Sequence, residues 1–319
     1  MALAASSHAP ALASARGGLR SALLASRNTD GGWGYRPGKR SRVEPTCFAL
    51  LALANECGGG ASCPAPVDAS VLLRWERHGE LLIDPGATHP NVGFNAIAAL
   101  VAQYAPPTGT RLAAPLIRAL MQHRGVTLPE SAIIEQQNDL VGWPWVDGTF
   151  SWVEPTAWAL LALKQWARTH PTVEFATRID HGERLLRNRA CREGGWNYGN
   201  PLVLGKPLGP YAATSALALL ALSASARGEN LGELRRDPAD ALTERSIKTL
   251  RQLCTTEQSG FALALSVIAF RILGHASADL ERTLLALWRD SAFRGETVAT
   301  AIALYAVNGQ ADGYEAFRV

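Results

Sequence analysis

The chain has 319 residues, of which 47% are hydrophobic and 18% are charged, and its formal net charge is +3. This composition supplies ample material for a globular core and excludes the strongly basic surface that nucleic-acid binding requires. No run reaches the roughly 18 apolar residues of a membrane span. The first residues do not resemble a signal peptide, and the five cysteines show no CxxC spacing. We therefore predict a cytoplasmic protein with no nucleic-acid partner and no integral membrane segment, which leaves peripheral contact with a membrane open.

About twelve segments show helical periodicity, and the odd-numbered ones carry charge on one face while the even-numbered ones are almost uncharged. In chain order they lie near residues 10–27, 45–56, 66–82, 94–105, 110–124, 155–169, 172–190, 212–226, 238–256, 259–273, 277–292 and 296–308. A helix with one charged face lies at a surface, whereas a helix that is apolar all round is buried on all sides. The alternation predicts an all-α fold: one α/α toroid of about six helical hairpins over residues 1–319, with the apolar helices inside.

An internal repeat accompanies this alternation. Residues 30–53 read DGGWGYRPGKRSRVEPTCFALLAL and residues 140–163 read LVGWPWVDGTFSWVEPTAWALLAL, so that Trp143 stands 110 positions after Trp33. A looser third copy begins at Trp196 in GGWNYG. Each copy places a Gly-Trp loop before an apolar helix. We expect these three tryptophans to be buried and to hold the hairpins together.

The repeated motif resembles that of a known superfamily. A Gly-Trp loop followed by Pro-Thr-Ala-Trp-Ala-Leu-Leu-Ala-Leu is similar to the terpenoid-cyclase and protein-prenyltransferase toroids, in particular to squalene–hopene cyclases. The resemblance implies an inner ring of helices around an apolar cavity that takes an isoprenoid chain, as a prenyl diphosphate or a polyene. A fold of this kind hosts many activities, so the resemblance is more specific for fold than for function.

One branch of this superfamily depends on zinc. In protein prenyltransferase β-subunits, the stretch that resembles RPGKRSRVEPTCF supplies a zinc-binding histidine, and Pro45 stands at its position. Proline cannot bind a metal, and no other set of Asp, Cys and His has a tetrahedral spacing. We therefore expect no metal and no cofactor, with magnesium a candidate only if the substrate carries a diphosphate.

The other branch depends on a carboxylic acid. Class II terpene cyclases protonate an alkene with the middle aspartate of Asp-x-Asp-Asp-Thr-Ala, and the Thr-Ala of that motif matches the pair that begins at Thr156. The acid then falls on Glu154, while Trp152 and Pro155 replace the flanking aspartates. Glu44 holds the same place in the first repeat. These two glutamates are the candidate catalytic residues, although a Glu-Pro pair also simply opens a helix.

Two further groups are candidates for binding a substrate. Aromatic side chains at or just before inner helices could line a cavity and stabilise a cation through their π faces: Phe94, Trp145, Trp152, Trp158 and Tyr211. A basic run in the loop before the first inner helix is either a solvated face or a cradle for a diphosphate: Arg36, Lys39, Arg40 and Arg42.

The leading functional hypothesis is acid-initiated cyclisation of an isoprenoid chain, an isomerase- or lyase-type activity. Because the aspartate-rich motif is missing, the sequence leaves open whether the protein is an enzyme. The alternatives are a non-catalytic toroid that binds an isoprenoid, a lipid or another apolar small molecule, and a protein-interaction scaffold whose hole is packed shut. A basic loop favours ligand binding over the scaffold.

Overall fold

A computed structural model describes residues 2–56, 69–104, 109–130, 136–223, 238–308 and 314–318. Six mostly apolar helices form the inner set: α2 (Val43–Glu56), α3 (Val92–Tyr104), α5 (Val153–Ala167), α7 (Ala212–Ser223), α9 (Gly260–Ile272) and α11 (Thr297–Asn308). Five helices form the outer set: α1 (Ala2–Ala25), α4 (Gly109–Gln122), α6 (Val173–Asn188), α8 (Pro238–Leu253) and α10 (Ala278–Ser291).

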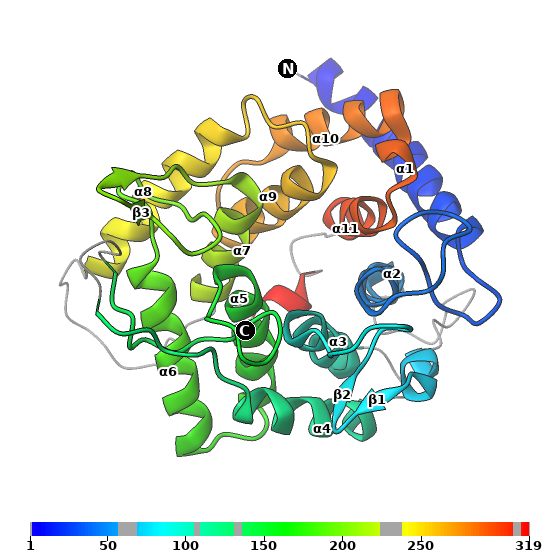
Figure 1. The fold of residues 1–319 in the computed structure, drawn as a ribbon. Helices are drawn as coiled ribbons and strands as arrows, with labels where there is room; N and C mark the ends of the chain where they lie inside the picture. Colours follow the sequence, from blue (N-terminus) through cyan, green and yellow to red (C-terminus); the bar gives the residue numbers. More distant parts are fainter. Residues whose placement is uncertain are drawn as a thin grey trace.

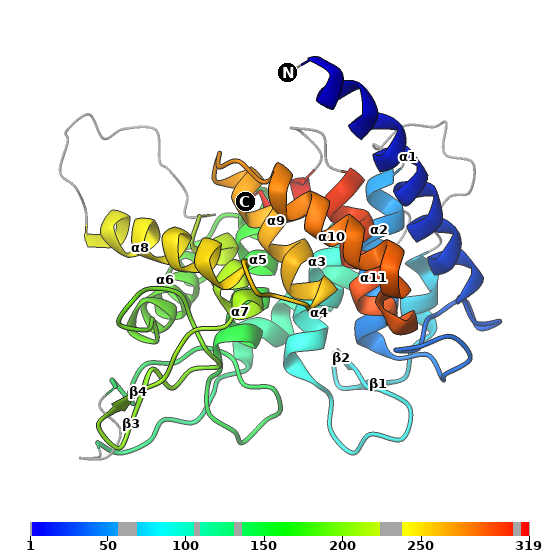
Figure 2. The ribbon, with the colours of Figure 1, turned by 90° about the horizontal axis from the view of Figure 1, so that it is seen from above.

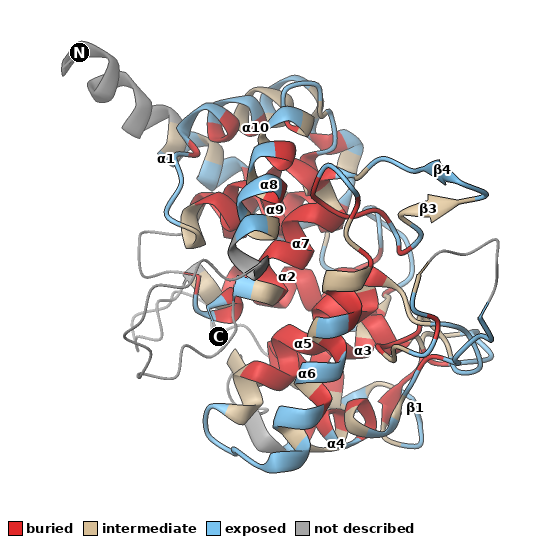
Figure 3. Ribbon diagram, turned by 90° about the vertical axis from the view of Figure 1, so that its left-hand side faces the viewer, coloured by how far each residue is buried: buried red, intermediate tan, exposed pale blue. Residues whose placement is uncertain are grey.

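The inner helices form a closed ring (Figure 1). Each packs against the next one along the chain, and α11 packs against α2 to complete the circle. The outer helices surround this ring, and buried residues concentrate in the inner helices (Figure 3). The structure therefore confirms the predicted all-α toroid. Alanine-rich inner helices suit this arrangement, because small side chains let helices approach closely on every side. None of the described helices combines the length and the apolar character that a bilayer-spanning segment needs.

One predicted helix is wrong. The described part of 66–82 forms a short 3-10 helix, η1 (Ala69–Arg74), and a hairpin of β1 (Arg77–His78) and β2 (Leu81–Leu82), while residues 66–68 lie outside the described part. Gly79 turns this hairpin with a φ of +62°, a conformation that favours glycine. The Asn95 side chain pairs with both backbone groups of Leu82. These bonds replace the helical ones that the periodicity suggested.

The remaining short elements lie in the loops. They are the hairpin of β3 (Leu202–Val203) and β4 (Lys206–Pro207), and the 3-10 helices η2 (Ala292–Gly295) and η3 (Glu315–Phe317). Figure 2 shows the ring from the side, with both hairpins at one end. We call this end the mouth of the ring.

The repeat has a direct structural explanation. The indole Nε1 of Trp33 donates to the carbonyl of Leu23 at the end of α1, and its backbone N–H donates to Thr46 Oγ1 in α2. Each Gly-Trp loop thus ties an outer helix to the following inner helix. The same two bonds recur at Trp143, with Leu120 and Thr156, and at Trp196, with Leu186 and Ser215. All three tryptophans are fully buried, which confirms the role predicted for them.

Aromatic side chains fill the axis of the ring. Phe48 of α2 touches Trp158 of α5, with ring centroids 5.5 Å apart, and Phe261 of α9, at 5.7 Å. These helices are alternate members of the ring, so contacts between them cross its centre. Phe317 of η3 packs on Trp158 from the opposite end to the mouth. Aromatic rings therefore occupy this part of the axis where an apolar cavity was expected, and Trp158 is a core residue rather than an accessible wall.

The chain end is held in place at the far end of the ring. Tyr104 at the end of α3 donates its hydroxyl to the Glu315 carbonyl, and Arg168 at the end of α5 donates to the Arg318 carbonyl. Phe317 is fully buried between inner helices. The segment that contains η3 therefore packs over the axis at that end.

Candidate active site at the mouth of the ring

The mouth is built from interlocked loops. The loops that precede α2, α5 and α7 each supply a backbone carbonyl to the first turn of a neighbouring inner helix. Trp145 accepts from Val92 N at 2.8 Å, Tyr198 accepts from Val153 N at 3.1 Å, and Tyr35 accepts from Thr297 N at 3.0 Å. These carbonyls satisfy N–H groups that a helix start leaves unpaired. The first turns of α3, α5 and α11 are therefore fixed relative to the loops around them.

Glu44 lies in the first turn of α2 at this mouth. Its carboxylate accepts a hydrogen bond from the Tyr35 hydroxyl at 2.6 Å. The pKa of Glu44 is raised to about 7, chiefly by burial and also by the charges of Asp84 and Glu296, while the Tyr35 bond opposes the shift. Since Glu296 directly precedes α11, the helix that closes the ring onto α2, residues from both ends of the chain act on this carboxyl.

Glu154 holds the equivalent position in α5. Burial raises its pKa to about 7, and the negative charge of Glu44 contributes in the same direction. The indole N–H of Trp158, one turn further along α5, hydrogen-bonds to the carboxylate and opposes the shift. The two glutamates are 110 residues apart in the chain, yet they lie close enough for one charge to change the ionisation of the other. The structure therefore brings both predicted catalytic residues to one site.

This pair has the properties of a general acid and a general base. A carboxyl whose pKa lies near neutrality both donates and accepts a proton readily at physiological pH. When Glu44 is ionised and held by Tyr35, its charge favours the protonated form of Glu154. Neighbouring carboxyls with raised pKa values are typical of sites that carry out acid–base catalysis.

Aromatic side chains form a rim beside the two carboxyls. Tyr198 and Tyr211 are about half exposed and lie with ring centroids 5.1 Å apart. Burial raises the pKa of Tyr198 and the charge of Glu154 adds to the rise, which places this tyrosine near Glu154. Phe94 and Trp145 form an edge contact at 5.8 Å.

Trp145 approaches the helix behind it so closely that only glycine fits there. A Cβ atom at Gly93 would lie 2.6 Å from the Trp145 ring, so the glycine in the first turn of α3 lets the indole lie flat against the helix. Trp152, the last residue before α5, instead stacks on Phe150 with ring centroids 4.9 Å apart. Four of the five predicted aromatic residues are thus at the mouth, and only Trp158 faces the core.

The sequence analysis missed Tyr198, although the repeat contains the signal for it. Tyr35, Trp145 and Tyr198 each stand two residues after the buried tryptophan of their own copy. In each copy the tryptophan turns into the core and the ring two residues later lies at the mouth. The register of the repeat, extended to its third copy, identifies this position.

The basic loop is not gathered around one point. Arg36, Lys39 and Arg40 are exposed, whereas Arg42 is partly buried and donates to the Pro85 carbonyl at 3.1 Å. The charge of Arg42 also lowers the pKa of Asp84 against the raising effect of burial. Asp84 in turn accepts from Val43 N and so caps α2. Among the residues that the structure describes, no group of three or more His, Cys, Asp and Glu side chains could hold a metal.

The raised pKa of Glu154 predicts a pH-dependent cost to stability. The pKa of its carboxyl rises from an ordinary value of 4.5 to about 7 on folding. The native state therefore binds more protons than the unfolded state between these values, and stability falls as the pH rises through 7. We expect Glu154→Gln to raise the free energy of unfolding by roughly 1–3 kcal/mol at pH 8 and by little near pH 4.5. Urea titrations at both values test this, and an equal effect at both would contradict it.

Comparisons with known proteins were made on sequence and on structure. No protein-family profile and no curated protein sequence matches the chain. Among solved structures, a selenomethionine derivative of a GH76 α-mannanase from Bacteroides thetaiotaomicron aligns with a TM-score of 0.59 and 10% sequence identity, over 93% of this chain and 95% of the mannanase. The likeness spans almost the whole of both chains and shows a shared α/α toroid fold.

This finding corrects the functional hypothesis drawn from the sequence. The prediction of a terpenoid cyclase acting on an isoprenoid chain is wrong: the matching toroid is a glycan hydrolase, and aromatic rings fill the axis where the isoprenoid cavity was expected. The recognised class, an α/α toroid, is correct, but the specific family is not. The basic loop accordingly loses its proposed role as a diphosphate cradle.

Proposed function

We propose that the protein hydrolyses glycosidic bonds at the mouth of the ring. The observation that carries this proposal is the pair of electrostatically coupled glutamates, Glu44 and Glu154, each with a pKa of about 7. Glycoside hydrolysis requires two carboxyl groups, one that protonates the leaving oxygen and one that acts as base or nucleophile. The likeness of the fold to an α-mannanase supports the same reaction class, although a fold alone does not define an activity.

The roles of the two carboxyls follow from their surroundings. Glu154, whose protonated form is favoured by burial and by the charge of Glu44, donates its proton to the oxygen of the leaving sugar. Glu44, held as a carboxylate by the Tyr35 hydroxyl, either attacks the anomeric carbon or removes a proton from the attacking water. The configuration of the released sugar distinguishes these two courses: retention indicates attack by Glu44 and inversion indicates attack by water.

The aromatic rim supplies a surface for the sugar. One face of a pyranose ring carries mainly C–H groups, which pack on flat aromatic side chains, while its hydroxyls stay at the edge and hydrogen-bond. Tyr198 and Tyr211 offer such faces beside Glu154. Their exposure, about half for each, is what a chain of sugars crossing the mouth would cover.

The experiment that tests the proposal is a hydrolysis assay on defined glycans. Purified protein is incubated with α- and β-linked mannans, glucans and galactans, and new reducing ends are measured over time. An α-linked mannan is the first substrate to test, because the structural neighbour is an α-mannanase. We expect hydrolysis of at least one of these polymers. If all of them stay intact under conditions that keep the protein folded, the proposed activity is refuted.

A further inference from the structure

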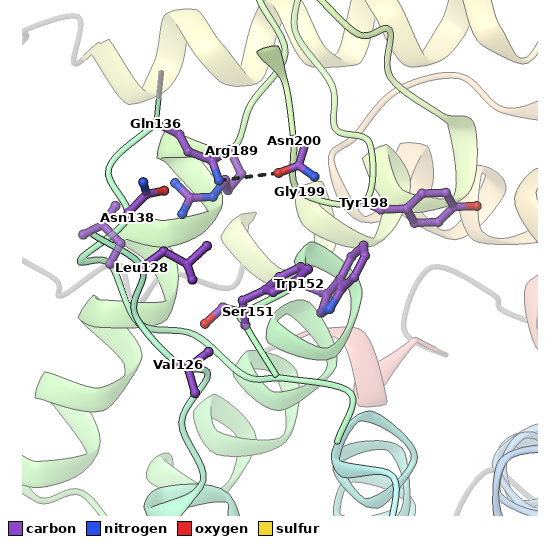
Figure 4. A pocket seen from close by; sticks show the side chains of 12 residues that line it. Val126, Leu128, Gln136, Asn138, Ser151, Trp152, Arg189, Tyr198, Gly199 and Asn200 are labelled. Atoms are coloured by element: carbon purple, nitrogen blue, oxygen red, sulfur yellow. Dashed lines mark hydrogen bonds between the residues drawn. The ribbon is translucent and has the colours of Figure 1, made fainter. Parts of the chain in front are cut away.

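A depression lies between the loop that precedes α5 and the loop that follows α6 (Figure 4). Its volume is about 130 Å³. Trp152 and Tyr198 belong both to its lining and to the mouth. Trp152 directly precedes α5, and the charge of Glu154 acts on Tyr198. The other main lining residues are Phe150, Gln136, Arg189 and Asn200. We call this depression the side pocket.

Arg189 brings a buried positive charge to the side pocket. It ends α6 and is only 5% exposed. Its guanidinium donates to the Gln137 carbonyl at 3.0 Å and to the Asn188 side chain. Within the described part of the chain it forms no ion pair, and Asp139, whose charge acts on it, is exposed. Burial lowers the pKa of Arg189 to about 10, which reflects the cost of a buried charge that is not neutralised.

The pocket also holds an acceptor without a donor. Gln136 Oε1 is buried and has no hydrogen-bond partner among the described residues, while its amide nitrogen makes only a long contact of 3.5 Å with Asn200 Oδ1. A buried carbonyl oxygen of this kind is satisfied by an N–H or O–H group of a ligand. Arg189 can therefore receive an anion, and Gln136 Oε1 can receive an O–H or N–H group of a ligand.

The size and the walls of the side pocket restrict the ligand further. One water needs at least about 10–15 Å³ of such space, so 130 Å³ holds on the order of ten heavy atoms, close to one pyranose unit. The stacked rings of Phe150 and Trp152 offer an apolar wall for the C–H face of that unit. Among the described residues that line the pocket there is no aspartate or glutamate, and the carboxylate of Asp139, which acts on Arg189, lies outside the lining.

We propose that the side pocket binds an acidic sugar unit, a uronic acid residue of the glycan, with its carboxylate on Arg189 and a hydroxyl on Gln136. This proposal rests on the proposed function, because the side pocket is taken to be a subsite next to the glycosidic bond that is cleaved. A guanidinium pairs well with a carboxylate, and such charge-assisted hydrogen bonds are roughly twice as strong as neutral ones. The protein would thus select glycans that carry a carboxylate beside the bond to be cut.

Direct binding measurements test this site independently of hydrolysis. The ligands are the methyl glycosides of glucuronic, galacturonic and mannuronic acid, each measured beside its neutral hexose counterpart by NMR titration of the folded protein. We expect at least one acid to bind about tenfold more tightly than its neutral counterpart, and the difference to shrink as salt is added. Arg189→Met should remove the preference. Gln136→Glu, which adds a negative charge without disturbing the Arg189 bonds to the backbone, should remove it as well.

The matched control is Arg192→Met, which removes the same charge three residues further on from an exposed position and should leave binding unchanged. Equal affinity for acidic and neutral sugars, no binding by any acid, or an equal response to plain acetate would each overturn the proposal. Melting temperatures show whether a variant is folded. If an acid binds but no glycan is cleaved, only the proposed function fails; if glycans are cleaved without a preference for acids, only the side-pocket proposal fails.

Discussion

Replacing Glu154 with glutamine is expected to lower kcat/KM for glycan hydrolysis by a factor of about 10²–10⁴. Glutamine keeps the shape of the side chain and still accepts the hydrogen bond from the Trp158 indole, but it cannot donate a proton to the leaving oxygen. Binding of the glycan should change little, because the aromatic rim stays intact. The loss should therefore appear mainly in kcat, measured from initial rates on the most reactive polymer.

Its control is Glu174→Gln. Glu174 is the second residue of α6, as Glu154 is of α5, but it lies fully exposed on an outer helix. This variant should keep wild-type activity. The pH profile of the wild-type protein is a second check. Activity needs Glu44 ionised and Glu154 protonated, so it should fall on both sides of a maximum near pH 7, with apparent pKa values that belong to the pair. Full activity of Glu154→Gln would remove the glutamate from the mechanism.

Trp143→Ala is expected to lower the free energy of unfolding by ~3–5 kcal/mol. The indole is fully buried and donates to the Leu120 carbonyl at 2.8 Å. The Arg178 guanidinium lies 3.4 Å from the ring centroid and donates to backbone carbonyls of the same loop, among them that of Gly142. Truncation leaves a cavity between α4 and α5, an unpaired carbonyl and a buried cation without its aromatic face. Each of these is a recognised source of large destabilisation.

Equilibrium unfolding in urea measures this loss. Tyr211→Ala provides the comparison, since Tyr211 is a large aromatic residue of the equivalent loop in the next repeat but is 53% exposed. Its substitution should lower the free energy of unfolding by less than about 1 kcal/mol. Equal midpoints for Trp143→Ala and the wild-type protein would show that the tryptophan does not tie the hairpins together.

Much of the fold could be predicted from local patterns. Charged faces alternate with apolar helices along the chain, and the repeat, with its looser third copy, marks where three of the inner helices begin. These signals suffice because the buried face of each helix sets the spacing of the apolar residues within that helix alone. The prediction of a helix over 66–82 is wrong because part of this segment forms a hairpin whose partner is Asn95. No local pattern reveals a partner that lies outside the segment.

The candidate site was predictable only in part. The repeat identified Glu44 and Glu154 and placed both in first helical turns, because the motif around each is the same. It did not predict that they would act on each other, which follows from closure of the ring. The side pocket is a purely tertiary feature, since Arg189 and Trp152 come from different loops.

By itself, the sequence determined a ring of apolar helices tied by buried tryptophans, since helix periodicity and the repeat depend only on residues near in the chain. Only the tertiary structure decided what fills the centre of that ring. A phenylalanine or tryptophan on an inner helix has the same pattern whether it lines a cavity or meets another ring across the axis. Here Phe48 contacts both Trp158 and Phe261. The proposed chemistry therefore lies at the mouth, where carboxyls of separate helices come together at the edge of solvent.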